Sequence, residues 1–96
     1  MANTYKNIEL PRNTITDVNA AIAAIAGVIV PAGTLMRVHN LSNNVVIRVR
    51  TAASLPASMD GWVPLLPYEQ IETEPTDGKL YMQPMGTTCE INVELL

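Results

Sequence analysis

Apolar and polar side chains alternate along short segments of this chain from residue 34 onward, and this alternation sets the class of fold. In the clearest segment, 88–95, the apolar positions are Cys89, Ile91, Val93 and Leu95. Successive side chains of a strand point to opposite faces of a sheet, so a period of two indicates a strand with one buried face. The segments 34–39, 45–50 and 79–83 alternate in the same way.

Turn-forming residues separate the alternating segments and define further strands. Residues 40–44, 75–78 and 84–87 are rich in Asn, Pro, Asp or Gly, which favour tight turns. Two more short strands are expected at 62–66 and 68–74. We predict a mainly β fold, a small β-sandwich or barrel of six to seven antiparallel strands with one short N-terminal helix.

The short Asn-rich turn at 40–44 also predicts which strands are neighbours. The strands on either side of this turn are expected to pair as a hairpin. Arg48 and Arg50 should then face outward, and they would lie opposite Glu90 and Glu94 if their strands are adjacent. Each such exposed ion pair contributes only about 0–1 kcal/mol, so it would help set the register rather than hold the fold.

The segment 14–27 is the one candidate for a helix. Thr16 or Asp17 can cap its start by accepting a hydrogen bond from a backbone N–H, and Gly27 suits the left-handed position that ends a helix. The apolar residues at helical spacing are Val18, Ile22, Ile25 and Ile29. A helix this short is marginal alone and must dock on the sheet. A loop followed by a strand through 28–30 is the alternative.

The length of 96 residues corresponds to one domain. We place an N-terminal arm at 1–13 and a single β-sandwich domain at 14–96. Within the arm, residues 5–10 can add one short strand, which Pro11 would end. This arm can pair with the edge of its own domain or reach a neighbouring copy. Charged residues make up only 16% of the chain, against about 25% in average globular proteins. A surface this poor in charge is better tolerated when neighbouring copies cover it.

Charge is unevenly divided along the chain. Five basic and two acidic residues give 1–50 a net charge of +3, whereas one basic and seven acidic residues give 51–96 a net charge of −6. The two halves can pair across strands, or a basic and an acidic face can meet between copies. Neither arrangement supplies the basic stripe that binds nucleic acid. The apolar stretch 20–30 is too short for a membrane span, so neither nucleic acid nor a membrane is expected as a partner.

Single reactive residues do not suggest catalysis. Cys89 is the only cysteine, so the chain has no internal disulfide, and a chain of this kind suits a reducing cytoplasm. His39 is the only histidine, and it lies on a different predicted strand from Cys89. Because catalysis needs a nucleophile beside a base, a pair of tuned acids or a metal, we predict that the protein is not an enzyme.

Acidic residues do not form a recognisable metal or cofactor site. Glu69, Glu72 and Glu74 resemble a carboxylate cluster, but a solvent-exposed acidic face is the simpler interpretation. Asp60 and Asp77 lack the spacing of a calcium-binding loop. The sequence therefore predicts no metal and no cofactor.

Aromatic residues offer an alternative function. Trp62, together with Tyr68 or Tyr81, would stack on sugar rings if the three side chains lined one exposed face. The chain would then be a carbohydrate- or host-surface-binding module. The competing interpretation is that Trp62 covers the core beside Leu65 or Leu66.

The order of several short motifs resembles a known group of proteins. These motifs are Thr16–Ala21, Gly27–Gly33, Val38–Ser42, Val45–Arg48, Leu55–Ser58, Asp60–Pro67, Gly78–Tyr81 and Ile91–Leu95. They resemble the small β-rich virion structural proteins of tailed bacteriophages, and the resemblance runs from residue 16 to residue 95. The motifs are turn and core positions, and the arm at 1–13 has no counterpart in the pattern.

This resemblance implies a non-enzymatic virion structural protein, present in many copies as a capsid decoration or cement protein or as a collar or tail component. It would be made in the host cytoplasm and reside in the virion. Its partners would be other copies of the chain, in a trimer or larger ring, and other virion proteins such as the major capsid protein. The candidate interface residues are Tyr5, Ile8, Leu10, Arg48, Arg50, Trp62 and Tyr68.

Overall fold

The computed structural model describes residues 4–27, 29–56, 61–73 and 78–96. In chain order the elements are β1 (Thr4–Leu10), β2 (Thr16–Asp17), α1 (Val18–Ala26), β3 (Met36–Asn40), β4 (Ile47–Ala52), β5 (Val63–Leu65), β6 (Gln70–Glu72), β7 (Lys79–Pro84) and β8 (Cys89–Leu95). The fold is therefore mainly β with one short helix, as the alternation predicted. Residues 75–77 of the turn predicted at 75–78 lie outside the described residues.

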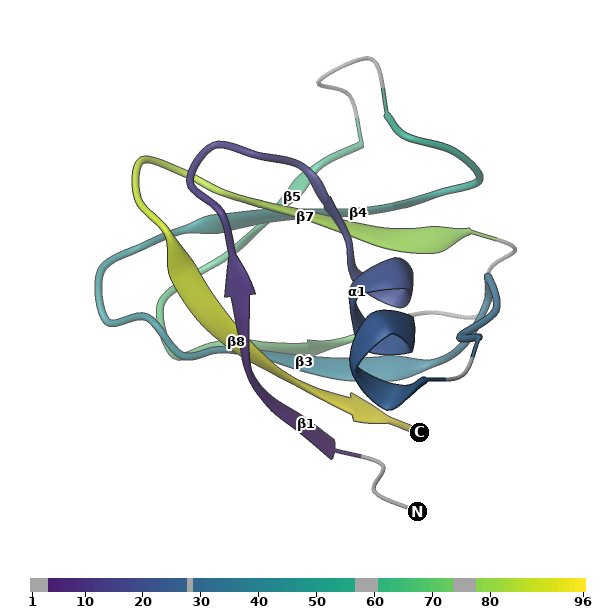
Figure 1. Ribbon diagram of the computed structural model, residues 1–96. Coiled ribbons are helices and arrows are strands. Elements are labelled where there is room, and N and C mark those ends of the chain that lie inside the picture. Colours follow the sequence, from purple (N-terminus) through teal and green to yellow (C-terminus); the bar gives the residue numbers. More distant parts are fainter. Residues whose placement is uncertain (1–3, 28, 57–60, 74–77) are drawn as a thin grey trace.

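The strands form two four-stranded antiparallel sheets in a sandwich-like arrangement (Figure 1). Sheet A has the order β1-β8-β3-β6, and sheet B has the order β2-β7-β4-β5. The described residues thus contain eight strands, and the predicted number of six to seven is wrong. The additional strand is β2, in which only Thr16 and Asp17 pair with β7. Alternation cannot be recognised in two residues, and these two fall inside the segment predicted as a helix.

Aliphatic side chains fill the space between the sheets. Sheet A contributes Met36, Val38, Ile91 and Val93, and sheet B contributes Ile47, Val49, Leu80 and Met82. Each of these side chains is at most 3% exposed, and each occupies a position that the alternation predicted to face inward. Burial of one such side chain is worth about 1.5–3 kcal/mol, so this apolar layer is what holds the two sheets together.

Helix α1 lies beside the two layers, near the end of the molecule where the C terminus emerges (Figure 1). Asp17 caps it by accepting a hydrogen bond from the Ala20 N–H at 3.1 Å, and Gly27 ends it with a φ of 74°. The sequence predicted both the Asp17 cap and the end of the helix at Gly27. The prediction that Ile25 and Ile29 share the buried face is wrong, because they are 60% and 87% exposed. Because the Asn19 side chain is buried, the helix is oriented so that Ile25 lies at the edge of the helix face that contacts the sheets.

Asn40 carries the chain from sheet A to sheet B. Its side chain is fully buried, and its Nδ2 donates to the carbonyl oxygens of Val45 at 2.9 Å, Leu65 at 3.3 Å and Leu66 at 3.2 Å. Its Oδ1 accepts a hydrogen bond from the Ser42 N–H at 2.9 Å. β3 and β4 therefore lie in different sheets, and the predicted hairpin is wrong. The Asn40 side chain bonds the carbonyl oxygens of Leu65 and Leu66 at the end of β5, and so joins the end of β3 to sheet B.

This topology rules out the predicted pairing of Arg48 and Arg50 with Glu90 and Glu94. Arg48 and Arg50 lie on β4 in sheet B, whereas Glu90 and Glu94 lie on β8 in sheet A, so they are not opposite each other. Arg48 donates instead to the Oε1 atom of Gln83 on the neighbouring strand β7. The prediction that these arginines face outward is confirmed, but the predicted neighbouring strand, β8, is wrong.

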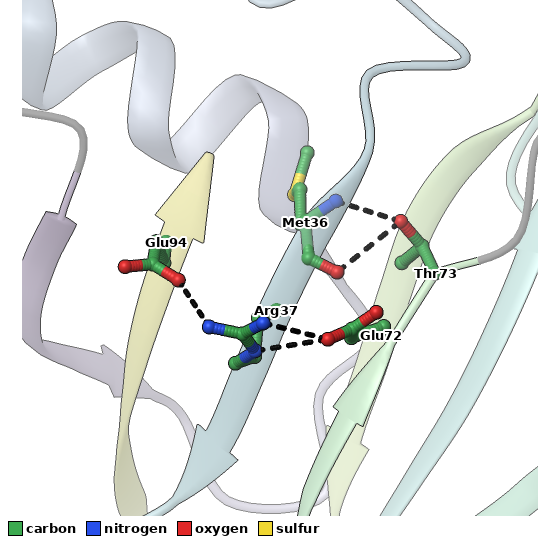
Figure 2. A network of polar contacts seen from close by, with 5 residues as sticks. All are labelled: Met36, Arg37, Glu72, Thr73 and Glu94. Atoms are coloured by element: carbon green, nitrogen blue, oxygen red, sulfur yellow. Dashed lines mark hydrogen bonds and ion pairs between the residues drawn. The ribbon is translucent and has the colours of Figure 1, made fainter. Parts of the chain in front are cut away.

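Charged residues from the two halves of the chain pair across strands. Arg37 lies between two glutamates on the outer face of sheet A (Figure 2). Its Nη1 atom lies 2.6 Å from Glu94 Oε1, and its Nη2 atom lies 2.7 Å from Glu72 Oε1. The hydrogen bond with Glu72 and its negative charge raise the pKa of the Arg37 guanidinium. The Nζ atom of Lys79 lies 3.6 Å from the Oδ2 atom of Asp17. The two Arg37 pairs join a basic residue of the first half to acidic residues of the second half, whereas the Lys79–Asp17 pair joins the halves in the opposite sense.

The N-terminal strand β1 forms one edge of sheet A by pairing with β8. Ile8 and Leu10 are 5% and 0% exposed, and Tyr5 packs half-buried against the same core. The register shifts between Tyr5 and Ile8, where Asn7 adopts a φ of 55° and donates its N–H to Asn92 Oδ1. In this fold, residues 4–10 pair with the chain's own sheet.

We expect the substitution Asn40→Ala to lower the free energy of unfolding by about 2–4 kcal/mol, because it leaves buried backbone groups without partners. Asn43 lies exposed in the same turn, so Asn43→Ala is the matched control and should change stability by less than about 0.5 kcal/mol. Urea titrations followed by tryptophan fluorescence would measure both values. Equal effects of the two substitutions would contradict this role of Asn40.

Candidate interaction surface

The residues predicted from sequence as an interface do not form one surface. Tyr5, Ile8 and Leu10 contact the chain's own core, as described above. Arg48 and Trp62 lie together, with the guanidinium carbon 5.6 Å from the centre of the indole ring. This cation–π contact occupies part of the half-buried Trp62 side chain, so the ring is engaged within the fold.

The other two predicted residues are Arg50, which lies on the same strand as Arg48, and Tyr68. The Arg50 side chain lies over Gly61, and a Cβ atom at that glycine would come within 3.3 Å of the Arg50 Nε atom. Tyr68 lies in the turn between β5 and β6 and is 64% exposed. Tyr81 is only 4% exposed, so the three aromatic side chains considered for sugar binding do not line one exposed face.

The single histidine and the single cysteine lie in different environments. The Nε2 atom of His39 lies 3.1 Å from the Tyr68 carbonyl oxygen, in hydrogen-bonding contact. Cys89 is 6% exposed, and burial, followed by the charge of Glu90, raises the pKa of its thiol. A thiol with a raised pKa carries little of the thiolate that acts as a nucleophile.

The acidic residues have structural partners. Glu69 Oε1 accepts a hydrogen bond from the Leu66 N–H at 2.7 Å, and Glu72 pairs with Arg37. Glu74, Asp60 and Asp77 lie outside the described residues. Within the part of the chain that the structure describes, no three His, Cys, Asp or Glu side chains gather where they would hold a metal ion.

Helix α1 carries its polar residue on the inside and apolar residues on the outside. Asn19 is the one polar residue of Val18–Ala26, and it is 2% exposed. The exposed positions are Ala20, Ala24 and Ile25. A helix on the surface of a soluble protein ordinarily shows charged or polar side chains to water, whereas a helix that is apolar all round is buried. The outer face of α1 is therefore a candidate interaction surface.

Three hydrogen bonds of Asn19 explain this orientation. Its Nδ2 donates to the carbonyl oxygens of Pro31 at 2.8 Å and Val30 at 3.3 Å, and its Oδ1 accepts from the Leu80 N–H at 2.9 Å. These bonds join the helix to strand β7 and to residues 30–31, which follow the helix in the chain. An amide held by three buried partners cannot turn toward water without breaking them, so the apolar side chains remain outside.

The apolar surface continues beyond the helix. Residues 18–36 include 19 consecutive positions without a charged side chain. A hollow of about 320 Å³ separates Ala20 and Ala23 from the segment at 29–32, and Ile29 forms part of its wall. We call the exposed residues of α1, Ile29 and this hollow the α1 face. Among the described residues, no helix is long and apolar enough to cross a membrane.

A second exposed apolar region surrounds the turn from Leu66 to Glu69. The Glu69 N–H donates to the Leu66 carbonyl at 3.0 Å, Pro67 is the second residue, and Tyr68 has a φ of 62°. This is the pattern of a type II turn, whose third residue is ordinarily Gly or Asn. A tyrosine there is strained by about 1–2 kcal/mol, and its ring is exposed. Strained residues of this kind gather at functional sites.

Sequence reasoning identified Tyr68 but missed the α1 face. The signal for the α1 face was present, because the nine residues VNAAIAAIA contain no charge and only one polar side chain. The helical spacing of Val18 and Ile22 suggested that the isoleucines would all face inward. The destination of Asn19 could not be predicted, because its partner Leu80 is 61 residues away.

Comparison with known proteins does not add a family. Searches against protein-family models, curated proteins and solved structures gave no match. Function is therefore inferred from the surfaces of this chain and from the motif order of its sequence.

We expect Tyr68→Gly to raise the free energy of unfolding by about 0.5–1 kcal/mol, because glycine adopts positive φ without strain and the exposed ring contributes little packing. Tyr68→Ala is the matched control, since it also removes the ring but keeps the strained Cβ atom. Thermal unfolding followed by circular dichroism would compare the two. A glycine variant no more stable than the alanine variant would show that the turn is not strained.

Proposed function

We propose that this chain is a non-enzymatic bacteriophage virion structural protein that assembles in many copies, as a capsid decoration or cement protein or as a collar or tail component. The observation that carries the proposal is the α1 face, an apolar surface with its one polar helix residue turned inward. An apolar surface of this kind on a small domain marks a site of contact with another protein.

Composition and chemistry support an assembly role. Only 16% of residues are charged, so a large part of the surface resembles one that neighbours cover. His39, Glu69, Glu72 and Glu94 have hydrogen-bond or ion-pair partners within the fold, and burial raises the pKa of the Cys89 thiol. The virion assignment itself is supported by the motif order from residue 16 to residue 95.

The edges of the sheets support a closed assembly rather than open-ended strand addition. The edge strand β5 contains Pro64, which has no N–H to offer a further strand. The edge strand β1 carries the irregularity at Asn7 and the exposed Lys6, and the edge strand β6 is only three residues long. Such devices prevent pairing between sheet edges, so copies would meet through side chains, in a trimer or larger ring.

We expect the purified protein to form one defined oligomer, a trimer or a larger ring, at micromolar concentration. Size-exclusion chromatography with multi-angle light scattering would measure its mass, and dilution would show whether the mass is that of a closed species. A stable monomer at high micromolar concentration would count decisively against an assembly role.

The second candidate is a carbohydrate- or host-surface-binding module, and the exposed, strained Tyr68 favours it. A ring held in solvent at an energetic cost can stack on a sugar. Trp62 is engaged by Arg48 and Tyr81 is buried, so Tyr68 would act as the main aromatic contact. The two functions are compatible, because the α1 face and the Tyr68 turn belong to different segments.

This second function predicts binding on a glycan array that is lost in Tyr68→Ala. Trp62→Phe is a suitable control, since it keeps a ring under Arg48 and should retain binding. Circular dichroism would confirm that both variants are folded. An array without signal for the wild-type protein would remove this candidate and leave the assembly proposal unaffected.

A further inference from the structure

We infer that a hollow at one end of the sandwich binds a neutral saccharide. The hollow measures about 530 Å³ and lies where the β3–β4 turn meets the β7–β8 turn and the end of β1, at the end of the molecule away from α1 (Figure 1). A volume of this size is usual for small-molecule pockets, which range from roughly 300 to 1,000 Å³. We call this hollow the turn-end pocket. The inference rests on the second candidate function, saccharide binding, and names the pocket and the class of saccharide.

The lining of the turn-end pocket is rich in groups that bond hydroxyls. Carboxylate, amide and hydroxyl side chains are contributed by Glu9, Glu90, Asn7, Asn44 and Thr87. Carboxylates accept hydrogen bonds, whereas amides and hydroxyls both donate and accept them. The hydroxyl groups around a sugar ring also donate and accept, so one ring can bond groups of all three kinds.

The pocket also has an apolar part. Leu41 and Val45 line it beside the polar groups, and Leu41 is half-buried. A sugar ring carries C–H groups on its faces and hydroxyls around its edge, so it can contact apolar and polar lining at once. Ligand pockets ordinarily combine apolar lining with a few polar groups that fix the orientation of the ligand.

The charge of the pocket selects a ligand without negative charge. Glu9 and Glu90 lie directly opposite each other in the register of β1 and β8, and neither takes part in an ion pair within the described part of the chain. None of the described lining residues is basic. Like charges placed opposite each other destabilise a sheet, and they repel phosphate, sulfate or carboxylate groups on a ligand. Hydroxyls that donate to both carboxylates form strong, charge-assisted hydrogen bonds.

The size of the pocket favours a saccharide over a cation. A metal ion or an ammonium group is about as large as a water molecule, whose share of liquid volume is roughly 30 Å³. It would fill only a small part of the 530 Å³. It would also leave the amides of Asn7 and Asn44 and the hydroxyl of Thr87 without a partner on the ligand.

Backbone hydrogen bonds hold the walls of the pocket in place. The Leu41 N–H donates to the Glu90 carbonyl oxygen at 3.2 Å, which joins the β3–β4 turn to β8. The Arg12 N–H donates to Thr88 Oγ1 at 3.1 Å, which joins the chain after β1 to the β7–β8 turn. Because the walls are fixed before a ligand arrives, binding has little conformational entropy to remove from them.

The Tyr68 turn lies close enough to extend the same site. The Asn40 N–H donates to the Glu69 carbonyl oxygen at 2.9 Å, and the next residue, Leu41, bonds Glu90 at the pocket. In sheet A, β3 lies between β6 and β8, so about two strand spacings, ~10 Å, separate the Tyr68 turn from the pocket. An oligosaccharide with one ring in the pocket can therefore extend toward Tyr68.

A glycan array that carries neutral glycans and their sialylated or uronic acid counterparts tests the class of ligand. Wild type should bind neutral glycans and give no signal with the acidic counterparts. The variant Glu9→Gln/Glu90→Gln keeps the size of both side chains and removes their charge. It should bind neutral glycans roughly 10-fold more weakly and begin to bind the acidic ones.

The matched control is Glu72→Gln/Glu94→Gln, which removes two negative charges from the same face of sheet A but outside the turn-end pocket. It should keep the preference of wild type for neutral glycans. Circular dichroism checks that both variants are folded. Equal changes of preference in the two variants would attribute the selection to net charge and would overturn the assignment of the pocket.

Amide NMR spectra of the wild-type protein, titrated with the neutral glycan that gives the strongest array signal, locate the site. We expect the largest shifts at residues 41–45 and 87–90, and none in α1. Shifts confined to α1 or to sheet B would contradict the inference. Shifts of the pocket amides with calcium chloride or spermidine, but with no glycan, would identify a cation site and would also overturn it.

The outcomes separate this inference from the function on which it rests. An array without signal for wild type would contradict both the pocket and saccharide binding, and would leave the assembly proposal unaffected. Glycan binding that is lost in Tyr68→Ala but unchanged in Glu9→Gln/Glu90→Gln would retain saccharide binding and overturn the pocket. Binding restricted to acidic glycans would overturn the class of ligand.

Discussion

The burial of Asn19 is the constraint on which the outer surface of this protein depends. Its amide bonds the Leu80 N–H and the carbonyl oxygens of Val30 and Pro31, so one side chain ties α1 to sheet B and to the loop that follows the helix. A buried amide that loses its partners costs about 1–3 kcal/mol for each group left unpaired. The helix is therefore held in one orientation, and its alanines and Ile25 must face outward.

A second buried asparagine has the same kind of effect on the topology. Asn40 bonds the backbone at Val45, Leu65 and Leu66, and so directs the chain from one sheet to the other. The aliphatic core between the sheets supplies the stabilisation, but it would accept several arrangements of strands of similar length. The observed arrangement satisfies the hydrogen bonds of both asparagines, and an arrangement that left them buried without partners would be disfavoured. In this protein, polar side chains select the arrangement and apolar side chains stabilise it.

The parts of the fold that depend on local patterns were predictable from sequence. The strands at 79–83 and 88–95, the Asp17 cap and the Gly27 end each follow from residues within a few positions of each other. The parts that depend on distant partners were not. The pairing of β3 with β8 rather than β4, and the inward position of Asn19, are fixed by backbone groups far along the chain. The candidate site was missed for that reason, although the lack of charge in 18–36 was visible from the start.

An image of the assembled protein by electron cryomicroscopy tests the central claim most directly, because it shows what covers the outside of α1. We predict an assembly of many copies in which a neighbouring protein covers the exposed residues Ala20, Ala24 and Ile25. A ring whose helices lie on the periphery with Ala20 and Ala24 in solvent would contradict the account.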